Sequence, residues 1–495
     1  MAMRTQTETY RGYGKTAELT SQTSVECRFG GEVETVLAAH ASAALSGAEA
    51  GNGEVRYFGK VFFSVVYEDA EKRVCRAEKG MEFTARAQDE RCYPALTARA
   101  ALTVENLSVR REGASVYVSA LLGADISLYG ETTCEYLSGG DLICRREPIG
   151  VFCAHLCGGA LETEDEFETE LIGDILLHAE TANVTQISCT AGALIAEGEV
   201  SLNLLALRGE NVPVSFERLI PFRAEIPCDA AAIGCSGEAR VSVGRVSLRA
   251  EPDEDRGKCR IAAQLSLSVE GCVYEEVTLD AVTDAFSSAN ALTLSFGTLR
   301  SESVGEPVCL TERIAGKAAL SAPVDFSDTL QAVTLQRAEA NLVQTESGKR
   351  VEGIATATLL VLGADGAHRG VEMSIPFSVS VQFSGECRVS VMACGMSARQ
   401  KQEGEIDAEA TLKIAVREAK RRECRFVSSA EEGDALPVSD SAVSVYIPCA
   451  GDGLWELSKR LGKSPEEVEA NNPDLQFPVK EGQRIIIYRK KTVRG

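Results

Sequence analysis

Apolar and polar residues alternate along most of the chain. In the stretch 377–383, Phe, Val, Val and Phe take every second position, with Ser and Gln between them, and 265–270 repeats the pattern with Leu, Leu and Val. A period of two places one set of side chains on the core face of a β-strand and the other towards water. Clusters such as 251–255, rich in charge and proline, separate the runs as hairpin loops do. The pattern predicts antiparallel sheets in two layers, with little helix before residue 440.

The β pattern occurs in three related copies. Each has a run that starts with glycine and continues with apolar residues, at 58–69, 197–208 and 352–363. A hairpin-like pair of runs follows each one, at 102–122, 239–269 and 387–416. A unit of roughly 120–155 residues is far longer than a solenoid repeat. We therefore expect three β domains in tandem, and in that register 410–422 is a strand although its composition also fits a helix.

Two further features define the expected divisions of the chain. The second and third copies share a Pro-Phe step, at 221–222 and 376–377, which the first copy lacks. A polar, acidic stretch with one proline then separates the copies from a final segment of different character. The expected divisions are an N-terminal tail at 1–17, β-sandwich-like repeats at 18–148, 149–305 and 306–430, an acidic linker at 431–442, and a C-terminal module at 443–490.

The C-terminal module has the order strand, helix, helix, strand. Alternating apolar residues at 443–447 predict the first strand, and leucines at 454, 457 and 461 share one helix face. Gly462 suits the end of that helix, and Ser464-Pro465 with Glu467 forms a capping box for the next. Pro473 ends the second helix and residues 483–488 form the closing strand. This mainly β chain is therefore expected to end in a small βααβ (α+β) module.

Charge separates the same two parts. The formal net charge is −22, but residues 443–495 hold nine Lys/Arg and seven Asp/Glu, so residues 1–442 carry −24. Such an acidic surface repels phosphate backbones and anionic lipid, so nucleic acid and membranes are poor partners. No run of 18 apolar residues predicts a transmembrane helix, and the first 20 residues lack the apolar centre of a secretory signal. The 17 cysteines include no CxxC pair, which favours reduced thiols.

The C-terminal module resembles the LysM family over its whole length. The matching residues are Tyr446, Gly451-Asp452, Leu454-Trp455, Leu457, Leu461, Asn472-Pro473-Asp474-Leu475 and Gly482-Gln483-Arg484-Ile485-Ile486-Ile487. The chain differs at Gly453, where threonine is usual, and at Cys449 in the same loop. We expect Trp455 in the core, because a module this small needs its large apolar side chains buried.

The LysM resemblance implies a binding groove between two loops. Carried over, its residues are Gly451, Asp452, Gly453 and Leu454 in the first loop, and Asn472, Pro473, Asp474 and Leu475 in the second. Shallow loops with backbone donors suit the N-acetyl groups of peptidoglycan or chitin. The other interpretation of these residues is structural, with Asn472 shaping a turn.

The order of β repeats followed by this module resembles the clostridial spore-coat morphogenesis family, which carries SPOCS repeats ahead of a C-terminal LysM. The carrying features are the runs at Gly198 and Gly353, the two Pro-Phe steps, and the string 283–287, Thr-Asp-Ala-Phe-Ser. The resemblance implies a non-catalytic scaffold on the mother-cell, cytoplasmic side of the forespore surface. There it would link a coat-basement ATPase to other spore coat proteins, with the LysM as the contact. It implies no cofactor.

The chemistry-bearing residues leave two alternatives. One is a peptidoglycan-binding LysM protein. The other is an enzyme with its site between repeats, but the sequence has no GxGxxG, HExxH or GxSxG motif and none of its four histidines indicates a catalytic site. Cys144, Cys153, His155 and Cys157 fall within 14 residues and have ligand types that suit zinc. One strand cannot easily wrap three ligands around an ion, so we favour free or buried thiols.

Overall fold

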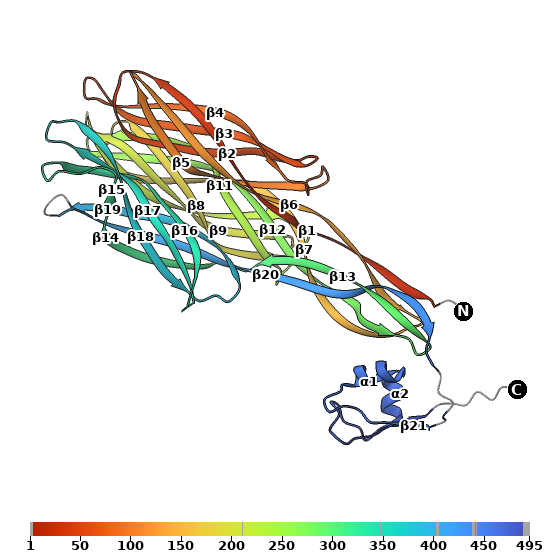
Figure 1. Ribbon diagram of the computed structural model, residues 1–495. Coiled ribbons are helices and arrows are strands. Elements are labelled where there is room, and N and C mark those ends of the chain that lie inside the picture. The colour runs from red at the N-terminus through yellow and green to blue at the C-terminus, as the bar shows by residue number, and fades with distance from the viewer. Residues whose placement is uncertain are drawn as a thin grey trace.

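The computed structural model describes residues 3–209, 211–346, 348–401, 405–437, 441 and 443–488. Figure 1 shows an elongated body of β-strands and, beside one end of it, a small C-terminal module. All strand pairs are antiparallel, and the two helices of the described residues both lie in that module. The predicted class, mainly β with antiparallel sheets, is therefore confirmed.

The body consists of three units with one strand plan. In each unit the sixth strand pairs with the first and the fifth, while the second, third and fourth strands form another sheet. The first unit contains β1 (Thr5–Gly30), β2 (Val33–Ala50), β3 (Glu54–Asp69), β4 (Val74–Gln88), β5 (Thr97–Glu112) and β6 (Ser115–Gly140). The second contains β7 (Ile143–Glu170), β8 (Ile175–Thr190), β9 (Ala193–Arg208), β10 (Val212–Pro227), β11 (Ser236–Asp253) and β12 (Lys258–Phe286).

The third unit follows the plan with two differences: its first strand is split into two, and a short additional strand joins its second sheet. It contains β13 (Asn290–Val304), β14 (Val308–Lys317), β15 (Ala319–Leu320), β16 (Thr329–Thr345), β17 (Gly348–Leu362), β18 (His368–Val381), β19 (Glu386–Gln400) and β20 (Ile406–Ala435). β13 and β14 pair in succession with β20, so together they replace one first strand. Pro307 lies in the gap and has no N–H to give to a ladder.

Alternation places the cores between the two sheets of each unit. In β12 the core takes Leu265, Leu267 and Val269, whereas the alternate residues Gln264 and Ser268 are exposed. The same rule holds in β18, where Phe377 and Val381 are buried and Ser378 and Ser380 are exposed. The stretch 410–422 lies within β20, as its register predicted.

The glycines that begin the repeated runs have a common structural cause. Gly59, Gly198 and Gly353 lie on β3, β9 and β17, the central strands of their sheets. An added Cβ at each would come under 3.0 Å from a carbonyl oxygen of the preceding strand. Only glycine fits where two backbones approach so closely.

A phenylalanine lies directly across from each of these glycines. Phe222 is directly across from Gly198 and Phe377 from Gly353, and each ring lies where the missing Cβ would be. Phe83 has the same position opposite Gly59 in the first unit. The first copy therefore keeps the phenylalanine of the Pro-Phe step and replaces only the proline, by Glu82.

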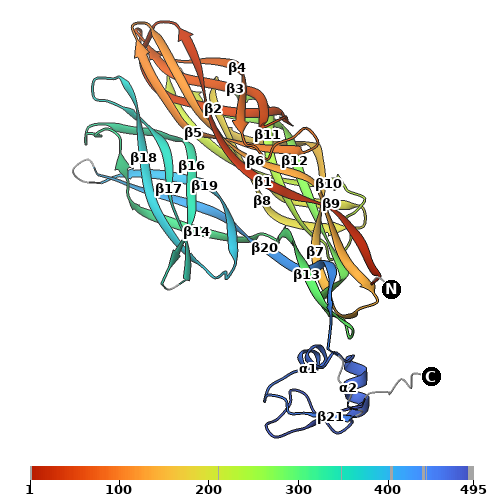
Figure 2. The ribbon, with the colours of Figure 1, turned by 45° about the vertical axis from the view of Figure 1, so that its right-hand side comes forward.

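The three units join along their longest strands. Beyond the sandwiches, β6, β12 and β20 continue with their partners β1, β7 and β13 into a shared bundle, which we call the stalk (Figures 1 and 2). Three apolar clusters hold it together, and each draws on all three units. Their buried members are Tyr129, Tyr136, Leu137, Ile149, Val151, Ala154, Cys272, Tyr274, Leu279, Ala281, Val282, Ala285, Leu299, Val304, Phe426 and Val427. A fourth cluster joins the second sheets of the units around Leu37, Leu205 and Leu360.

These strands cross the expected divisions. β1 starts at Thr5, so most of the expected tail at 1–17 is strand, and β7 runs through 148/149. Residues 431–435 of the expected linker extend β20 and pair with β13, while 438–440 and 442 lie outside the described residues. The units divide instead at 141–142, between β6 and β7, and at 287–289, between β12 and β13. The divisions are displaced because the long strands of the stalk extend past the ends of their sandwiches.

The C-terminal module has the predicted order of elements: β21 (Val443–Tyr446), α1 (Leu454–Leu461), α2 (Pro465–Asn471) and β22 (Ile485–Tyr488). Gly462 ends α1 at φ 59°, and the Ser464 hydroxyl accepts a hydrogen bond from the Glu467 N–H, so both caps are as expected. Within the described residues, neither helix has the length and apolar character needed to cross a membrane.

Candidate functional site

The first predicted groove loop is held by contacts inside the module. The Gly451 N–H donates to the Val479 carbonyl at 2.8 Å, and the Val479 N–H donates to that of Asp452 at 3.0 Å. The Asp452 carboxylate accepts from Arg460 at 2.8 Å and from the Cys449 N–H at 2.9 Å. Arg460 and this N–H hold the pKa of Asp452 below its usual range. Asp452 is thus committed to folding the loop.

The rest of the first loop begins helix α1. Gly453 is the N-cap residue in an extended conformation, and it offers no side-chain oxygen where a threonine would. Leu454 packs against the module core, which is formed by Leu457, Val468, Val479, Ile485 and Ile487.

The second predicted loop is also structural at its first residue. Asn472 is 9% exposed, and its amide nitrogen donates to the Val468 and Ile486 carbonyls at 2.9 and 3.0 Å. Its amide oxygen accepts from the Ile486 N–H at 2.7 Å. Asn472 therefore fastens α2 to β22, while Pro473 and Asp474 are exposed and Leu475 packs on the core.

The outer face of the β21–β22 sheet is apolar and exposed. Val443 lies opposite Tyr488 and Val445 opposite Ile486, so their side chains are neighbours across the two strands. The exposed fractions are 52% for Val443, 60% for Val445, 68% for Ile447, 37% for Ile486 and 52% for Tyr488. We call these five residues the apolar sheet face. The sequence showed the alternation but not that this set points outward.

Trp455 lies outside the module core, contrary to our expectation. It is partly buried, and its indole N–H donates to the Asp284 carboxylate of β12 at 2.8 Å. Its ring meets Phe286 edge to face, with centroids 5.3 Å apart. Lys459, one turn along α1, donates to the same carboxylate at 2.7 Å. The string 283–287, read only as a repeat marker, thus contacts the C-terminal module.

The Cys/His group considered for zinc is spread along β7. His155 pairs with Glu275 at 3.0 Å, and Cys153 accepts from the Tyr13 N–H at 3.4 Å. Cys144 packs in the stalk, whereas Cys157 packs in the sandwich core, where burial raises its pKa to about 12. These four side chains do not surround one point. Across the described parts of the chain, no group of three or more His, Cys, Asp or Glu side chains is placed to hold a metal ion.

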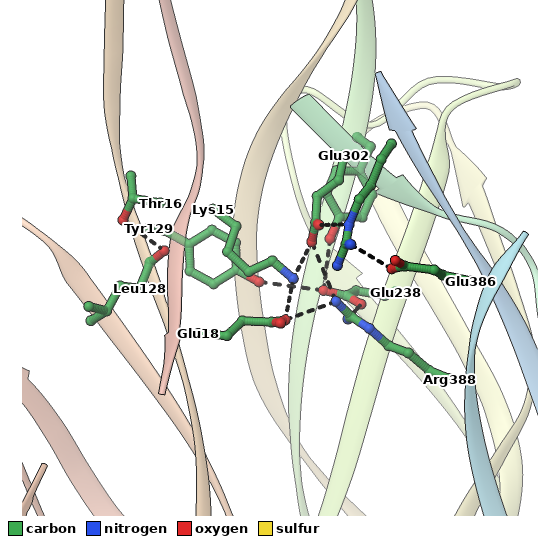
Figure 3. Close-up of polar contacts among 11 residues, drawn as sticks. Lys15, Thr16, Glu18, Leu128, Tyr129, Glu238, Glu302, Glu386 and Arg388 are labelled. Atoms are coloured by element: carbon green, nitrogen blue, oxygen red, sulfur yellow. Dashed lines mark hydrogen bonds and ion pairs between the residues drawn. The ribbon is translucent and has the colours of Figure 1, made fainter. Parts of the chain in front are cut away.

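An ionic cluster lies where the three units meet (Figure 3). Arg388 of β19 contacts Glu18 and Glu238 at 3.1 Å and Glu302 at 3.4 Å, one carboxylate from each unit. Lys15 adds ion pairs to Glu18 and Glu302, and only 6% of its side chain is exposed. Burial favours a lower pKa for Arg388, but the surrounding carboxylates outweigh it and raise that pKa. Sequence reasoning missed this cluster because the chain contains 73 acidic residues.

Comparisons of the chain with protein-family models, with curated proteins and with solved structures gave no match.

Proposed function

We propose that the protein is a non-catalytic scaffold of spore coat assembly, which binds a coat-basement ATPase through its C-terminal module and other coat proteins through its β units. The proposal rests on the resemblance of the repeats to SPOCS domains and of the module to LysM. In this proposal the protein acts at the cytoplasmic, mother-cell side of the forespore surface.

The observation that carries the proposal is the apolar sheet face of the module. Four large apolar side chains on the two-stranded sheet and Ile447, directly after β21, are between 37% and 68% exposed. Contiguous exposed apolar residues are typical of protein-binding surfaces. The near-neutral charge of residues 443–495, against −24 for the rest, makes the module the part that an acidic partner repels least.

The alternative function is binding of peptidoglycan at the LysM groove. Asp452 and Asn472 would be its polar contacts, but each already uses its side chain inside the module. A sugar would therefore find these two side chains already engaged, and few polar side chains of the two loops remain to bind it. This supports a protein partner over a glycan.

Binding of the full chain to the purified coat-basement ATPase tests the proposal. Val445→Lys together with Ile447→Lys puts two charges on the apolar sheet face, and we expect affinity to fall about tenfold or more, as for loss of an interface centre. The matched control is Ile354→Lys on β17, which also replaces an exposed apolar side chain (50% exposed) but lies in the β body rather than in the module.

Two outcomes would contradict the scaffold function. One is equal binding of the ATPase by the full chain and by a chain ending at residue 437. The other is sedimentation of the full chain with insoluble peptidoglycan that the apolar-face substitutions leave unchanged, which would favour the glycan alternative.

A further inference from the structure

The outer side of helix α1 is occupied by another part of the same chain. Trp455 and Lys459 are four residues apart, so they project from one face of the helix. Both donate to one carboxylate, that of Asp284, at 2.7–2.8 Å. Phe286, two residues further along β12, supplies the ring that packs on the indole. In both ribbon views α1 lies beside the free end of the stalk (Figures 1 and 2).

A bulge in β12 presents these groups outward. The register of β12 against β7 shifts between Val282 and Asp284. Val282 and Ala285 both remain in the stalk core on either side of the shift. Asp284 is thereby turned away from the core and towards the module, which is how β-bulges commonly re-aim a side chain.

We propose that the α1 face carrying Trp455 and Lys459 is a binding surface for a protein segment with a carboxylate two residues before an aromatic ring. The chain's own Asp284 and Phe286 occupy this surface, and a partner with a segment of the same chemistry displaces them. The surface itself rests on the contacts above; its use by a coat protein rests on the proposed function.

The donor set explains the chemistry of the occupant. An ammonium and an indole N–H both converge on one side chain, and a carboxylate can accept from both at once. An amide has a single acceptor atom and no charge for Lys459. The edge-to-face contact with Trp455 then selects an aromatic ring at the second position.

The contact of Asp284 and Phe286 with helix α1 has features that favour its replacement by a partner segment. Lys459 and Asp284 keep 45% and 26% of their side chains exposed, and the flanking Arg145–Glu456 pair is open to solvent at 3.9 Å. Only residues 436–442 separate β20 from β21, and a short tether gives an effective concentration on the order of millimolar. Occupancy in the free protein therefore needs little intrinsic affinity. A partner that also covers the apolar sheet face gains contacts that the stalk does not make.

Trp455 makes the test simple, because it is the single tryptophan of the chain. Its fluorescence is followed while a peptide of the chain's own residues 280–289 is added to full-length protein. The peptide is added to the native chain and to the variant Asp284→Asn/Phe286→Ala, which lacks the two side chains that occupy the α1 face. Peptides with the same two changes are the matched ligand controls.

We expect the emission of Trp455 to move to longer wavelength in Asp284→Asn/Phe286→Ala, and the native-sequence peptide to move it back. The peptide should bind the native chain about tenfold or more weakly than this variant, since most native molecules are already occupied. Adding Lys459→Gln to the variant should abolish peptide binding without touching the stalk. Asp280→Asn, on the same strand but paired with Arg146, should behave as native.

Three results would overturn the proposal. Equal peptide affinity for the native chain and the variant would show that the surface is not occupied internally. If the peptide fails to bind Asp284→Asn/Phe286→Ala, or binds it equally well after Lys459→Gln is added, the surface does not recognise this chemistry. None of these results involves a coat protein, so a failed ATPase interaction with successful peptide binding would reject the proposed function alone.

Discussion

Two junctions in the molecule are built in opposite ways. Where the three units meet, continuous strands, four apolar clusters and the cluster around Arg388 hold them together. Where the C-terminal module meets the stalk, the contact is small: the Asp284 carboxylate, the Phe286 ring and the solvent-exposed Arg145–Glu456 pair. Buried apolar area makes the first permanent, while the second remains open to competition.

The largest effect is expected at the junction of the units. Arg388→Met removes the cation that joins all three units: Glu238 loses its partner Arg388, while Lys15 still pairs with Glu18 and Glu302. Because breaking a largely buried ion pair strands a charge, we expect a loss of about 3 kcal/mol in the free energy of unfolding, measured by chemical denaturation. Arg300→Met is the control, since its side chain is 78% exposed and such pairs contribute little. Similar losses in both variants would mean that the cluster does not hold the units together.

A smaller effect is expected within a single sandwich. Gly353→Ala forces a Cβ against the Glu339 carbonyl and the Phe377 ring, so we expect thermal unfolding to report a loss of about 1–3 kcal/mol. Gly316→Ala on β14 meets nothing within 4 Å and should be close to neutral. If Gly353→Ala left the free energy of unfolding unchanged, close backbone approach would not be the reason for glycine at this position.

The smallest effect concerns the module contact and its dependence on pH. Burial acts to raise the pKa of Asp284, but the hydrogen bonds from Lys459 and Trp455 outweigh it and hold that pKa below its ordinary value of about 4. The contact should therefore be fully stabilised above that value and weaken as the pH falls through the lowered pKa. Trp455 emission should report this loss on acidification. In Asp284→Asn the emission should lack this transition; the same transition in that variant would assign it to other groups.

The sequence predicted what depends on neighbouring residues. Period-two alternation was enough for the strands of the sandwiches, and local caps at Gly462 and Ser464 were enough for the module helices. The repeated glycines marked equivalent strands because each copy meets the same close backbone approach. Phe83 escaped notice because the proline that marks its counterparts is absent from the first copy.

Contacts between distant segments could not be predicted in this way. Asp284 and Trp455 are 171 positions apart, and neither has a local pattern that points to the other. Trp455 was assigned to the core on size alone, although an indole with a free N–H also suits a contact between parts. Likewise, no local pattern separates the partly buried Glu238 from the many solvated carboxylates of this chain.

The length of β12 has a geometric consequence. Its 29 residues run without interruption from the outer loop of the second sandwich to the point where the module rests. At about 3.3 Å per residue, this strand is roughly 95 Å long. Groups attached at its two ends are therefore separated by up to about 95 Å, a distance limited by the covalent backbone of one strand rather than by assembly.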